Sequence, residues 1–354
     1  MQGGVDPDSE ELLRRWRESE RRSRERRASA ASRPKRPAAK RRPRGGAVLW
    51  AAAGALAVLL AAMALAPAEV SDDRGVPSGA PAQVGGPAAS APAKRRARER
   101  ARPQPTVVAL RRAWRYARSR GGEVSFAVVD TQGRLRGRRA RRRYVSASVV
   151  KAMLLAAEVR RLERQGQALD PATDGLLEAM ITRSDNDAAD SIYARVGDAG
   201  LNEVARAARA RRFTVAGYWA NAQITAADMA RFFVRVPRLV AGPHRGRALA
   251  LLRGIVDYQR WGVPRAAGRS WAVLFKGGWR ATGRGELVHQ AALLRSGRRK
   301  LAIAVLTDAQ PSRPYAIHTL RGVADRLLAS VPGTRAARTA RARRRAPAGR
   351  GRLG

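Results

Sequence analysis

The sequence predicts an α/β (α+β) domain between Thr106 and Pro332, and two observations support this fold class. Segments with strand-like patterns lie near both ends of this region, at residues 124–140 and 271–308. The stretch between them, residues 176–233, is rich in helical apolar periodicity. A sheet built from both ends of a domain leaves the middle to form a separate helical lobe. A ligand site is then expected in the cleft between the sheet and the lobe.

Each element has its own signal, in chain order. "TVVALRRAWRYARS" (106–119) spaces its apolar residues as a helix does, and "VSFAVVDTQGRLRGRRA" (124–140) predicts a strand, a turn and a second strand. A helix is expected over residues 148–161, where apolar positions recur on one face. Three β-rich segments punctuated by glycine follow within residues 271–308. The stretch "YAIHTLRGVADRLLASV" (315–331) predicts a closing helix.

The rest of the chain divides into four segments by composition. Residues 1–46 are polar and basic, which predicts a disordered segment. Residues 67–105 are rich in Pro, Gly and Ala and predict a flexible linker, and residues 333–354 predict an Arg-rich disordered tail. Residues 47–66, "AVLWAAAGALAVLLAAMALA", carry no charge and have the length of a membrane-spanning helix. We therefore expect one transmembrane helix ahead of the linker and the folded domain.

This apolar segment also predicts the location of the protein. The basic residues before it should stay in the cytoplasm, so we expect a single-pass cell-membrane protein with an extracytoplasmic domain. The alternative is secretion after signal cleavage, because "ALA" and "APA" resemble cleavage sites. The long charged stretch before the segment and Pro67 after the first such site argue against cleavage.

The charge and cysteine content restrict the partners. Lys and Arg number 71 against 28 Asp and Glu, a formal net charge of +43. The arginines occur along the whole chain, which indicates a compositional bias and disfavours nucleic acid as a dedicated partner. The Arg-rich segments could contact anionic cell-surface polymers, and we expect a monomer. With no cysteine, the chain has no disulfides and no catalytic or metal-binding thiols, which leaves the redox compartment open.

Lysine is rare in this arginine-rich chain, so its positions are informative. The folded domain contains only Lys151, Lys276 and Lys300. Arginine supplies a permanent charge equally well, but only lysine loses its proton readily enough to act as a base. Lys151 lies three residues after Ser148, at the start of a predicted helix where positions i and i+3 share one face. This spacing predicts a serine nucleophile with a lysine base.

Two further motifs follow in the sequence. Ser184-Asp185-Asn186 lies between two helical stretches, and Lys276-Gly277-Gly278 ends a predicted strand. Each has an ordinary explanation when taken alone. The first is a typical helix N-cap, and the second is a strand that ends in a glycine turn. An S-x-x-K pattern also arises by chance about once in a chain of this length.

In this order and on these elements, the three motifs resemble those of the penicillin-recognising serine hydrolases, which carry S-x-x-K, S-D-N and K-T-G. The resemblance is to class A β-lactamases and penicillin-binding proteins and covers most of the domain. "FAVVD" (126–130), "ITAADMARFF" (224–233) and "HQAALLR...LAIAVLTD" (289–308) extend it beyond the motifs. It implies a five-stranded antiparallel sheet flanked by helices, with an all-helical subdomain.

The resemblance also implies a role for each motif residue. Ser148 would be the acylated nucleophile, Lys151 its base, and Ser184 the proton relay to the leaving nitrogen. In the substrate-binding set, Asn186 would hold the substrate amide and Lys276 its carboxylate. Gly278 follows in the third motif, and the backbone N–H of Trp279 would complete an oxyanion hole with that of Ser148. The implied function is a membrane-anchored serine hydrolase acting on β-lactams or on a cell-wall peptide or amide.

Two departures from the family pattern qualify this function. Gly277 stands where the family has a hydroxyl-bearing residue that binds the substrate carboxylate, and Arg280 or Thr282 would have to replace it. Class A enzymes use a loop glutamate for deacylation, but residues 211–223, "RRFTVAGYWANAQ", contain no Asp or Glu. We therefore expect slow deacylation. The alternative is a non-catalytic module that binds peptidoglycan or a partner protein.

Nothing in the sequence indicates a catalytic histidine or a metal-binding site. There is no G-x-S-x-G motif that would place a serine beside one of the three histidines, His244, His289 and His318. No group of histidines and carboxylates has the spacing of metal ligands. We expect these histidines to be surface or core residues, and the protein to use neither a metal nor a cofactor.

Overall fold

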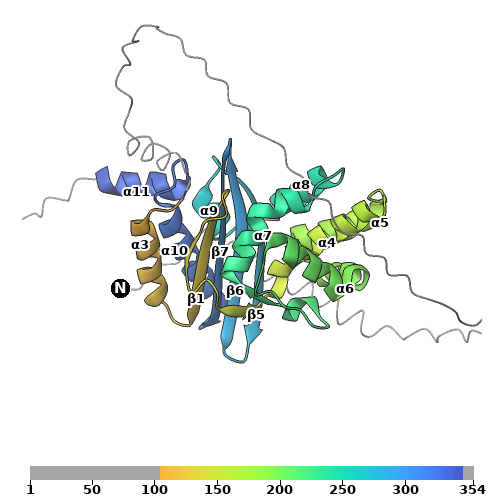
Figure 1. The fold of residues 1–354 in the computed structure, drawn as a ribbon. Helices are drawn as coiled ribbons and strands as arrows, with labels where there is room; N and C mark the ends of the chain where they lie inside the picture. The colour runs from red at the N-terminus through yellow and green to blue at the C-terminus, as the bar shows by residue number, and fades with distance from the viewer. Residues whose placement is uncertain (1–103, 346–354) are drawn as a thin grey trace, which may run out of the picture.

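A computed structural model describes residues 104–345 as one sheet with helices on both faces and a helical lobe beside it (Figure 1). The sheet has five antiparallel strands in the order β2-β1-β7-β6-β5. Their bounds are β1 Glu123–Asp130, β2 Leu135–Arg138, β5 Ala272–Thr282, β6 Gly285–Ser296 and β7 Arg299–Gln310. The first and last strands of the domain, β1 and β7, pair directly, as the sequence predicts for a sheet built from both ends.

Helices from the two ends of the domain cover one face of the sheet. Helix α10 (Arg313–Leu328) packs on β6 and β7, and α3 (Val107–Arg118) packs on α10 (Figure 1). The short helix α9 (Val263–Ala267) also contacts α10. Each long helix begins at a hydroxyl N-cap, since Thr106 accepts from the Ala109 N–H and Ser312 from the Tyr315 N–H.

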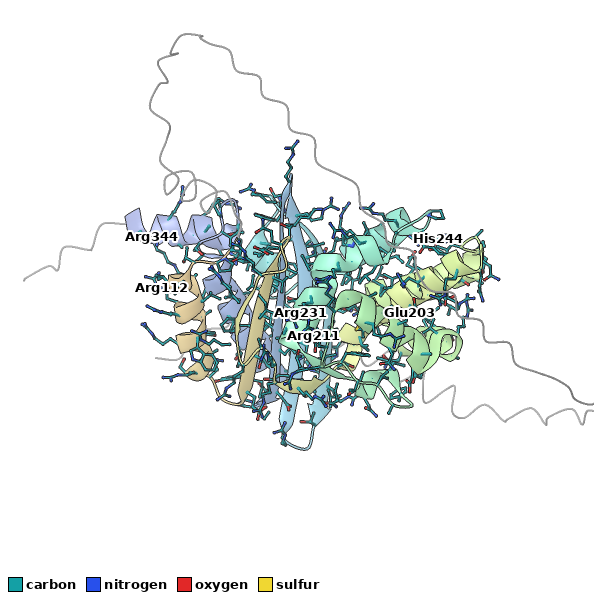
Figure 2. All side chains as sticks on the ribbon, in the orientation of Figure 1. Arg112, Glu203, Arg211, Arg231, His244 and Arg344 are labelled. Atoms are coloured by element: carbon teal, nitrogen blue, oxygen red, sulfur yellow. The ribbon has the colours of Figure 1, made fainter. Side chains whose placement is uncertain are left out.

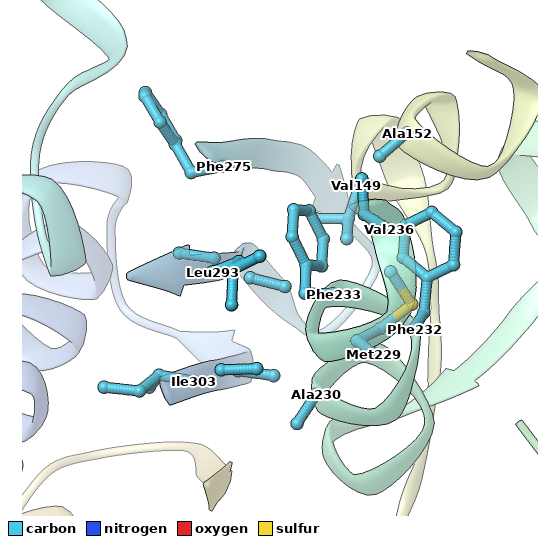
Figure 3. Close-up of a cluster of buried hydrophobic side chains, with 14 of the residues drawn as sticks. Val149, Ala152, Met229, Ala230, Phe232, Phe233, Val236, Phe275, Leu293 and Ile303 are labelled. Atoms are coloured by element: carbon cyan, nitrogen blue, oxygen red, sulfur yellow. The ribbon is translucent and has the colours of Figure 1, made fainter. Parts of the chain in front are cut away.

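Helix α7 (Ala226–Leu239) lies between the other face of the sheet and the helical lobe (Figure 3). Its Phe232 and Phe233 are fully buried, and their ring centroids lie 5.3 Å apart in an edge-to-face arrangement. The cluster also contains Phe275 from the sheet and Val149 from the segment before the lobe. The shared core therefore fixes the position of the sheet relative to the lobe.

The lobe consists of the remaining helices of the middle region. They are α4 Lys151–Arg164, α5 Pro171–Glu178, α6 Asn186–Ala208 and α8 Arg245–Arg253, with a π-helical turn at Ala179–Arg183. Short 3-10 turns occur at Ala147–Val150, Trp219–Asn221 and Asp257–Gln259, and β3 (Arg143–Val145) pairs with β4 (Gln223–Thr225) in a separate two-stranded sheet. The helix expected from residue 148 is thus a 3-10 turn followed by an α-helix that begins at Lys151.

The C-terminal segment differs from the prediction. The composition of residues 333–354 predicts a disordered tail, but Arg335–Arg345 form helix α11. Ala336 and Ala337 are buried, and Arg335 Nε donates to the carbonyl oxygen of Arg265 at 2.8 Å. These two small side chains allow the otherwise cationic helix to pack on α9. No apolar periodicity in this segment predicts the contact.

The predictions for residues 1–103 lie outside the described residues. They include the basic segment at 1–46, the transmembrane helix at 47–66 and most of the linker at 67–105. Within residues 104–345, no helix is both long enough and apolar enough to cross a membrane.

Candidate active site

Ser148 lies in a strained turn between β3 and α4. The residue before it, Ala147, has φ +45°, which a residue with a Cβ adopts only at a cost. The backbone N–H of Lys151 donates to the carbonyl oxygen of Ser148, closing a 3-10 turn in which side chains i and i+3 are eclipsed. The half-buried Ser148 and the fully buried Lys151 therefore lie on the same side of the turn.

This turn is held from two directions by residues that the sequence analysis did not identify. The Ser146 N–H donates to the Ala222 carbonyl at 2.8 Å, and Ser146 Oγ lies 3.2 Å from the Trp219 carbonyl oxygen. From the sheet, His289 Nε2 lies 2.9 Å from the Val145 carbonyl oxygen. Burial lowers the pKa of His289 to about 4, so the ring is neutral at pH 7. His289 is therefore a core residue, as expected, and it positions the strand that leads to Ser148.

Lys151 reaches the second motif through three hydrogen bonds. Its Nζ donates to the carbonyl oxygens of Ser184 at 2.6 Å and Asp185 at 2.9 Å, and to Asn186 Oδ1 at 2.6 Å. Three oxygen acceptors match the three N–H groups of an ammonium, whereas a neutral amine has only two. The Trp219 ring centroid lies 4.8 Å from the same Nζ, a cation–π distance. The surroundings of Lys151 therefore fit its charged form.

The second motif, Ser184-Asp185-Asn186, both caps helix α6 and contacts the two lysines. Ser184 has φ +65° and ends the π-helical turn, while Asp185 caps α6 by accepting from the Ala188 N–H at 2.8 Å. Asp185 is thus the helix N-cap that the sequence suggests. The sharp turn also directs the Ser184 hydroxyl toward Lys276 and the Asn186 amide toward Lys151.

Lys276 is fully buried on the edge strand β5 and connects the third motif to the second. Its Nζ donates to Ser184 Oγ at 3.0 Å and to the Gly277 carbonyl oxygen at 3.1 Å. Burial lowers the pKa of Lys276 to about 7. At neutral pH this amine can therefore both hold and release a proton, which a solvated lysine near 10.5 cannot do.

Gly278 brings β5 into contact with the Ser148 turn. A Cβ at Gly278 would lie 2.9 Å from the Ser148 nitrogen and 2.7 Å from the Val149 nitrogen, closer than real Cβ atoms come. Only glycine allows this approach. The backbone N–H groups of Ser148 and Trp279, predicted as an oxyanion hole, therefore come from segments that touch.

Gly277 faces an indole. A Cβ there would lie 3.4 Å from the six-membered ring of Trp261, which is buried and packs edge-on to Trp279 at 6.5 Å. The two residues proposed to replace the missing hydroxyl are engaged elsewhere. Arg280 donates to Asn221 Oδ1 at 3.0 Å, and Thr282 Oγ1 donates to the Gly285 carbonyl at 2.8 Å in the hairpin turn. The side chains of both residues are thus hydrogen-bonded within the protein, and their contact with a substrate carboxylate stays a prediction.

The loop without acidic residues, 211–223, closes over Lys151. Its Trp219 is 2% exposed, and the indole Nε1 donates to Asp190 Oδ1 at 2.6 Å. Arg280 ties the loop to β5 through Asn221 and the Ala220 carbonyl oxygen at 3.2 Å. The sequence shows that the loop lacks a carboxylate, but only the folded chain places an aromatic ring beside Lys151.

The described residues contain no group of three or more His, Asp or Glu side chains that could hold a metal ion. The candidate site is built from two lysines, two serines and one asparagine. Of the predicted site residues, the hydrogen bonds join Lys151, Ser184, Asn186 and Lys276, and backbone packing adds Ser148, Gly278 and Trp279.

The five-stranded antiparallel sheet and the helical lobe together form a β-lactamase-like fold. Residues 167–331 match the family model described as the β-lactamase enzyme family. This match contains Ser184, Asn186 and Lys276 and begins after Ser148 and Lys151. Sequence comparison with curated proteins finds no match for the chain.

Solved structures support the same fold. A β-lactamase from Sphaerobacter thermophilus is 19% identical, with a TM-score of 0.55 over 63% of this chain and 97% of that chain. A β-lactamase from Burkholderia vietnamiensis is 20% identical, with a TM-score of 0.56 over 63% and 96%. A class A β-lactamase from Mycobacterium abscessus is 18% identical, with a TM-score of 0.54 over 62% and 98%. At these identities the comparison establishes the fold and leaves the activity to be argued from the site.

Proposed function

We propose that the protein is a membrane-anchored serine hydrolase that forms an acyl-enzyme at Ser148, on β-lactams or on a cell-wall peptide or amide. The observation that carries this proposal is the hydrogen-bonded chain from Lys276 through Ser184 to Lys151, next to the strained Ser148 turn. Burying two lysine amines costs desolvation free energy, even when each is hydrogen-bonded, so a fold without a use for them gains nothing from keeping them. The set supplies a nucleophile, a base and a proton donor, which are the groups that acyl transfer needs.

In the proposed reaction, Ser148 Oγ forms an ester with the acyl carbon while the C–N bond breaks. Lys151 first releases one ammonium proton to bulk water and gives up one of its three hydrogen bonds, and its amine then accepts the Ser148 proton. The leaving nitrogen takes the hydroxyl proton of Ser184, and Lys276 replaces it across their 3.0 Å contact. The N–H groups of Ser148 and Trp279 would receive the developing oxyanion.

We further propose that the acyl-enzyme breaks down slowly. Hydrolysis needs a base for the attacking water, and losing a general base typically costs about a hundred- to ten-thousand-fold in that step. The loop 211–223 offers no carboxylate, and its buried Trp219 fills the space over Lys151. An indole cannot accept the proton of a water. The protein should therefore behave as a penicillin-binding protein or a slow hydrolase.

Intact-mass spectrometry of the full chain after incubation with benzylpenicillin tests the acylation. We expect a mass increase of one penicillin per chain, located at Ser148 by peptide mapping and absent from Ser148→Ala. Ser191→Ala is the matched control and should keep the adduct, because this exposed serine of α6 donates to the Asp187 carbonyl oxygen of its own helix. An adduct that persists in Ser148→Ala, or no adduct on a folded chain with penicillin, a cephalosporin or a D-alanyl ester, would contradict the proposal.

The alternative function, a non-catalytic binding module, rests on one observation. Trp261 lies against Gly277 in place of a carboxylate-binding hydroxyl, and Arg280 is committed to the loop. A module of this kind would bind a cell-wall peptide reversibly, with the same affinity in wild type and Ser148→Ala, and would form no covalent adduct.

A further inference from the structure

The loop at residues 211–223 inserts one aromatic side chain into the protein from a mostly exposed segment. The loop begins at the exposed Arg211, near Arg231 of α7 (Figure 2), and it carries two arginines and no acid. Residues 216–218 are exposed, whereas Trp219 is only 2% exposed. A buried indole needs a hydrogen-bond acceptor for its N–H, and a carboxylate for that task has to come from outside the loop.

Helix α6 supplies this acceptor through Asp190. Trp219 Nε1 donates to Asp190 Oδ1 at 2.6 Å. A hydrogen bond to a carboxylate is shorter and stronger than one between neutral groups. Asp190 is itself exposed, so the packing of the core does not explain an acid at this position. The contact with the indole does explain it.

The same face of α6 also bonds the candidate base. Asn186 precedes Asp190 by four residues, a spacing that places both side chains on one face of the helix. Asn186 Oδ1 accepts from Lys151 Nζ at 2.6 Å, and the Trp219 ring centroid lies 4.8 Å from that nitrogen. One turn of α6 therefore holds Lys151 directly through Asn186, and it holds the ring that faces Lys151 through Asp190.

A second carboxylate of α6 fixes the backbone of the loop. Asp198 Oδ2 accepts from the Gly217 N–H at 2.9 Å, and the Tyr193 hydroxyl also donates to Asp198. This bond holds the main chain two residues before Trp219 and does not involve the indole. An indole has a single donor, so Asp190 is the residue that fixes the direction of the ring by hydrogen bonding.

We propose that Asp190 is a positioning residue that fixes the Trp219 ring over Lys151 and thereby keeps water away from the lysine amine. Lys151 is fully buried and Trp219 nearly so, and the bond to Asp190 maintains this arrangement. Water that is excluded here cannot hydrolyse an acyl group on Ser148 with Lys151 as its base. The effect on hydrolysis rests on the proposed function, whereas the tether can be measured without a substrate.

Nitrogen-15 spectra of the full chain with labelled tryptophan test the tether. The chain contains seven tryptophans, and the Trp219 indole signal is the one that disappears in Trp219→Phe. Asp190→Ala should speed the hydrogen exchange of this indole N–H about tenfold or more, because a bond to a charged group is lost. Asp190→Asn should keep the slow exchange, because an amide oxygen also accepts. Unchanged exchange in Asp190→Ala would overturn the proposal.

Release of the penicillin adduct, followed by mass spectrometry, tests the effect on water. Asp190→Ala and Trp219→Phe should each release it at least about threefold faster than wild type, because the tethered indole is lost in both. Asp190 acts through the indole, so adding Asp190→Ala to Trp219→Phe should change the release rate little. An equal further gain in the double variant, or unchanged release in Asp190→Ala, would overturn the positioning role.

Asp187→Ala is the control, because Asp187 is exposed on the same helix and the substitution removes the same charge. It should change neither the indole exchange nor the adduct release. Equal effects of Asp187→Ala and Asp190→Ala would mean a general loss of helix charge or stability and would overturn the proposal. A folded wild-type chain that forms no adduct would contradict the proposed function, while the indole exchange would still decide whether Asp190 positions the ring.

Discussion

Lys151 Nζ lies 4.8 Å from the centroid of the Trp219 ring, so an aromatic residue of the 211–223 loop faces the candidate base. The two residues are 68 positions apart in sequence, and both are buried. A cation over an aromatic face is attracted by the ring quadrupole, more strongly when both are shielded from water. The contact therefore favours the charged form of Lys151.

Replacing this ring by an acid should speed deacylation. Trp219→Glu introduces a carboxylate next to Lys151, where it can accept a proton from water. We expect the deacylation rate constant to rise at least about tenfold, part of the effect of a general base. Release of the penicillin adduct, followed by mass spectrometry over time, measures it. Tyr218→Glu is the control, because this neighbour is 39% exposed. An equal gain in both variants, or none in a folded Trp219→Glu, would contradict the role assigned to Trp219.

Acylation should fall as the pH rises through about 7. Burial lowers the pKa of Lys276 to about 7, and only its ammonium form can return a proton to Ser184 for the leaving nitrogen. The second-order acylation constant reports the free enzyme, so its alkaline limb should lie near this value. Lys276→Arg keeps its charge but cannot release a proton to Ser184, so its acylation should be slower and should show no alkaline limb near pH 7. Stopped-flow measurement of the acylation rate constant from pH 5 to 9 tests this prediction. An alkaline limb that is unchanged in Lys276→Arg would mean that another group titrates there.

Alanine should be tolerated at Gly277 and not at Gly278. A Cβ at Gly278 would press on the backbone nitrogens of Ser148 and Val149 at 2.9 and 2.7 Å, whereas one at Gly277 would meet Trp261 at an ordinary 3.4 Å. We expect Gly278→Ala to lose about 1–3 kcal/mol of unfolding free energy and most of its acylation rate. Gly277→Ala should change both little. Urea unfolding and penicillin acylation of the two variants measure the difference, and equal behaviour would show that β5 does not press on the Ser148 turn.

Acidification should destabilise the fold through His289. Its pKa is about 4 in the folded protein and about 6.5 when unfolded, so between these values the unfolded chain binds more protons. The unfolding free energy should therefore fall as the pH drops from 6.5 to 4, by at most about 1.4 kcal/mol per pH unit from this residue. Urea unfolding at pH 7, 5.5 and 4.5 measures the slope. His289→Phe cannot titrate and should show a smaller slope, and an identical slope would assign the effect to other residues.

The domain should lie outside the cytoplasm and stay attached to the membrane. This prediction rests on the uncharged segment 47–66 and the basic residues before it. A reporter that is active only after export, fused after Gly354, should be active on the full chain. The same reporter on a matched chain without residues 47–66 should stay inactive in the cytoplasm. A cytoplasmic reporter on the full chain would contradict the topology. A mature N-terminus near Glu69 would replace the anchor by a cleaved signal.

Features that depend only on neighbouring residues follow from the local sequence. The spacing of Ser148 and Lys151 places them in one turn, and apolar periods define the strands and helices. The Asp185 cap of α6 is equally local. The absence of acids in residues 211–223 is also read directly from the chain. These features predict the sheet and the lobe, whereas the motif residues of the candidate site were assigned through the family resemblance.

The environment of those residues depends on how distant segments of the chain pack around them. Trp219 beside Lys151, Trp261 against Gly277 and His289 under Val145 are contacts between segments far apart in sequence, and no local pattern encodes them. The low pKa of Lys276 has the same origin, because burial depends on what the rest of the chain packs around the amine. The sequence therefore names the reacting groups, while packing determines their charge, their access to water and the direction in which a proton can move.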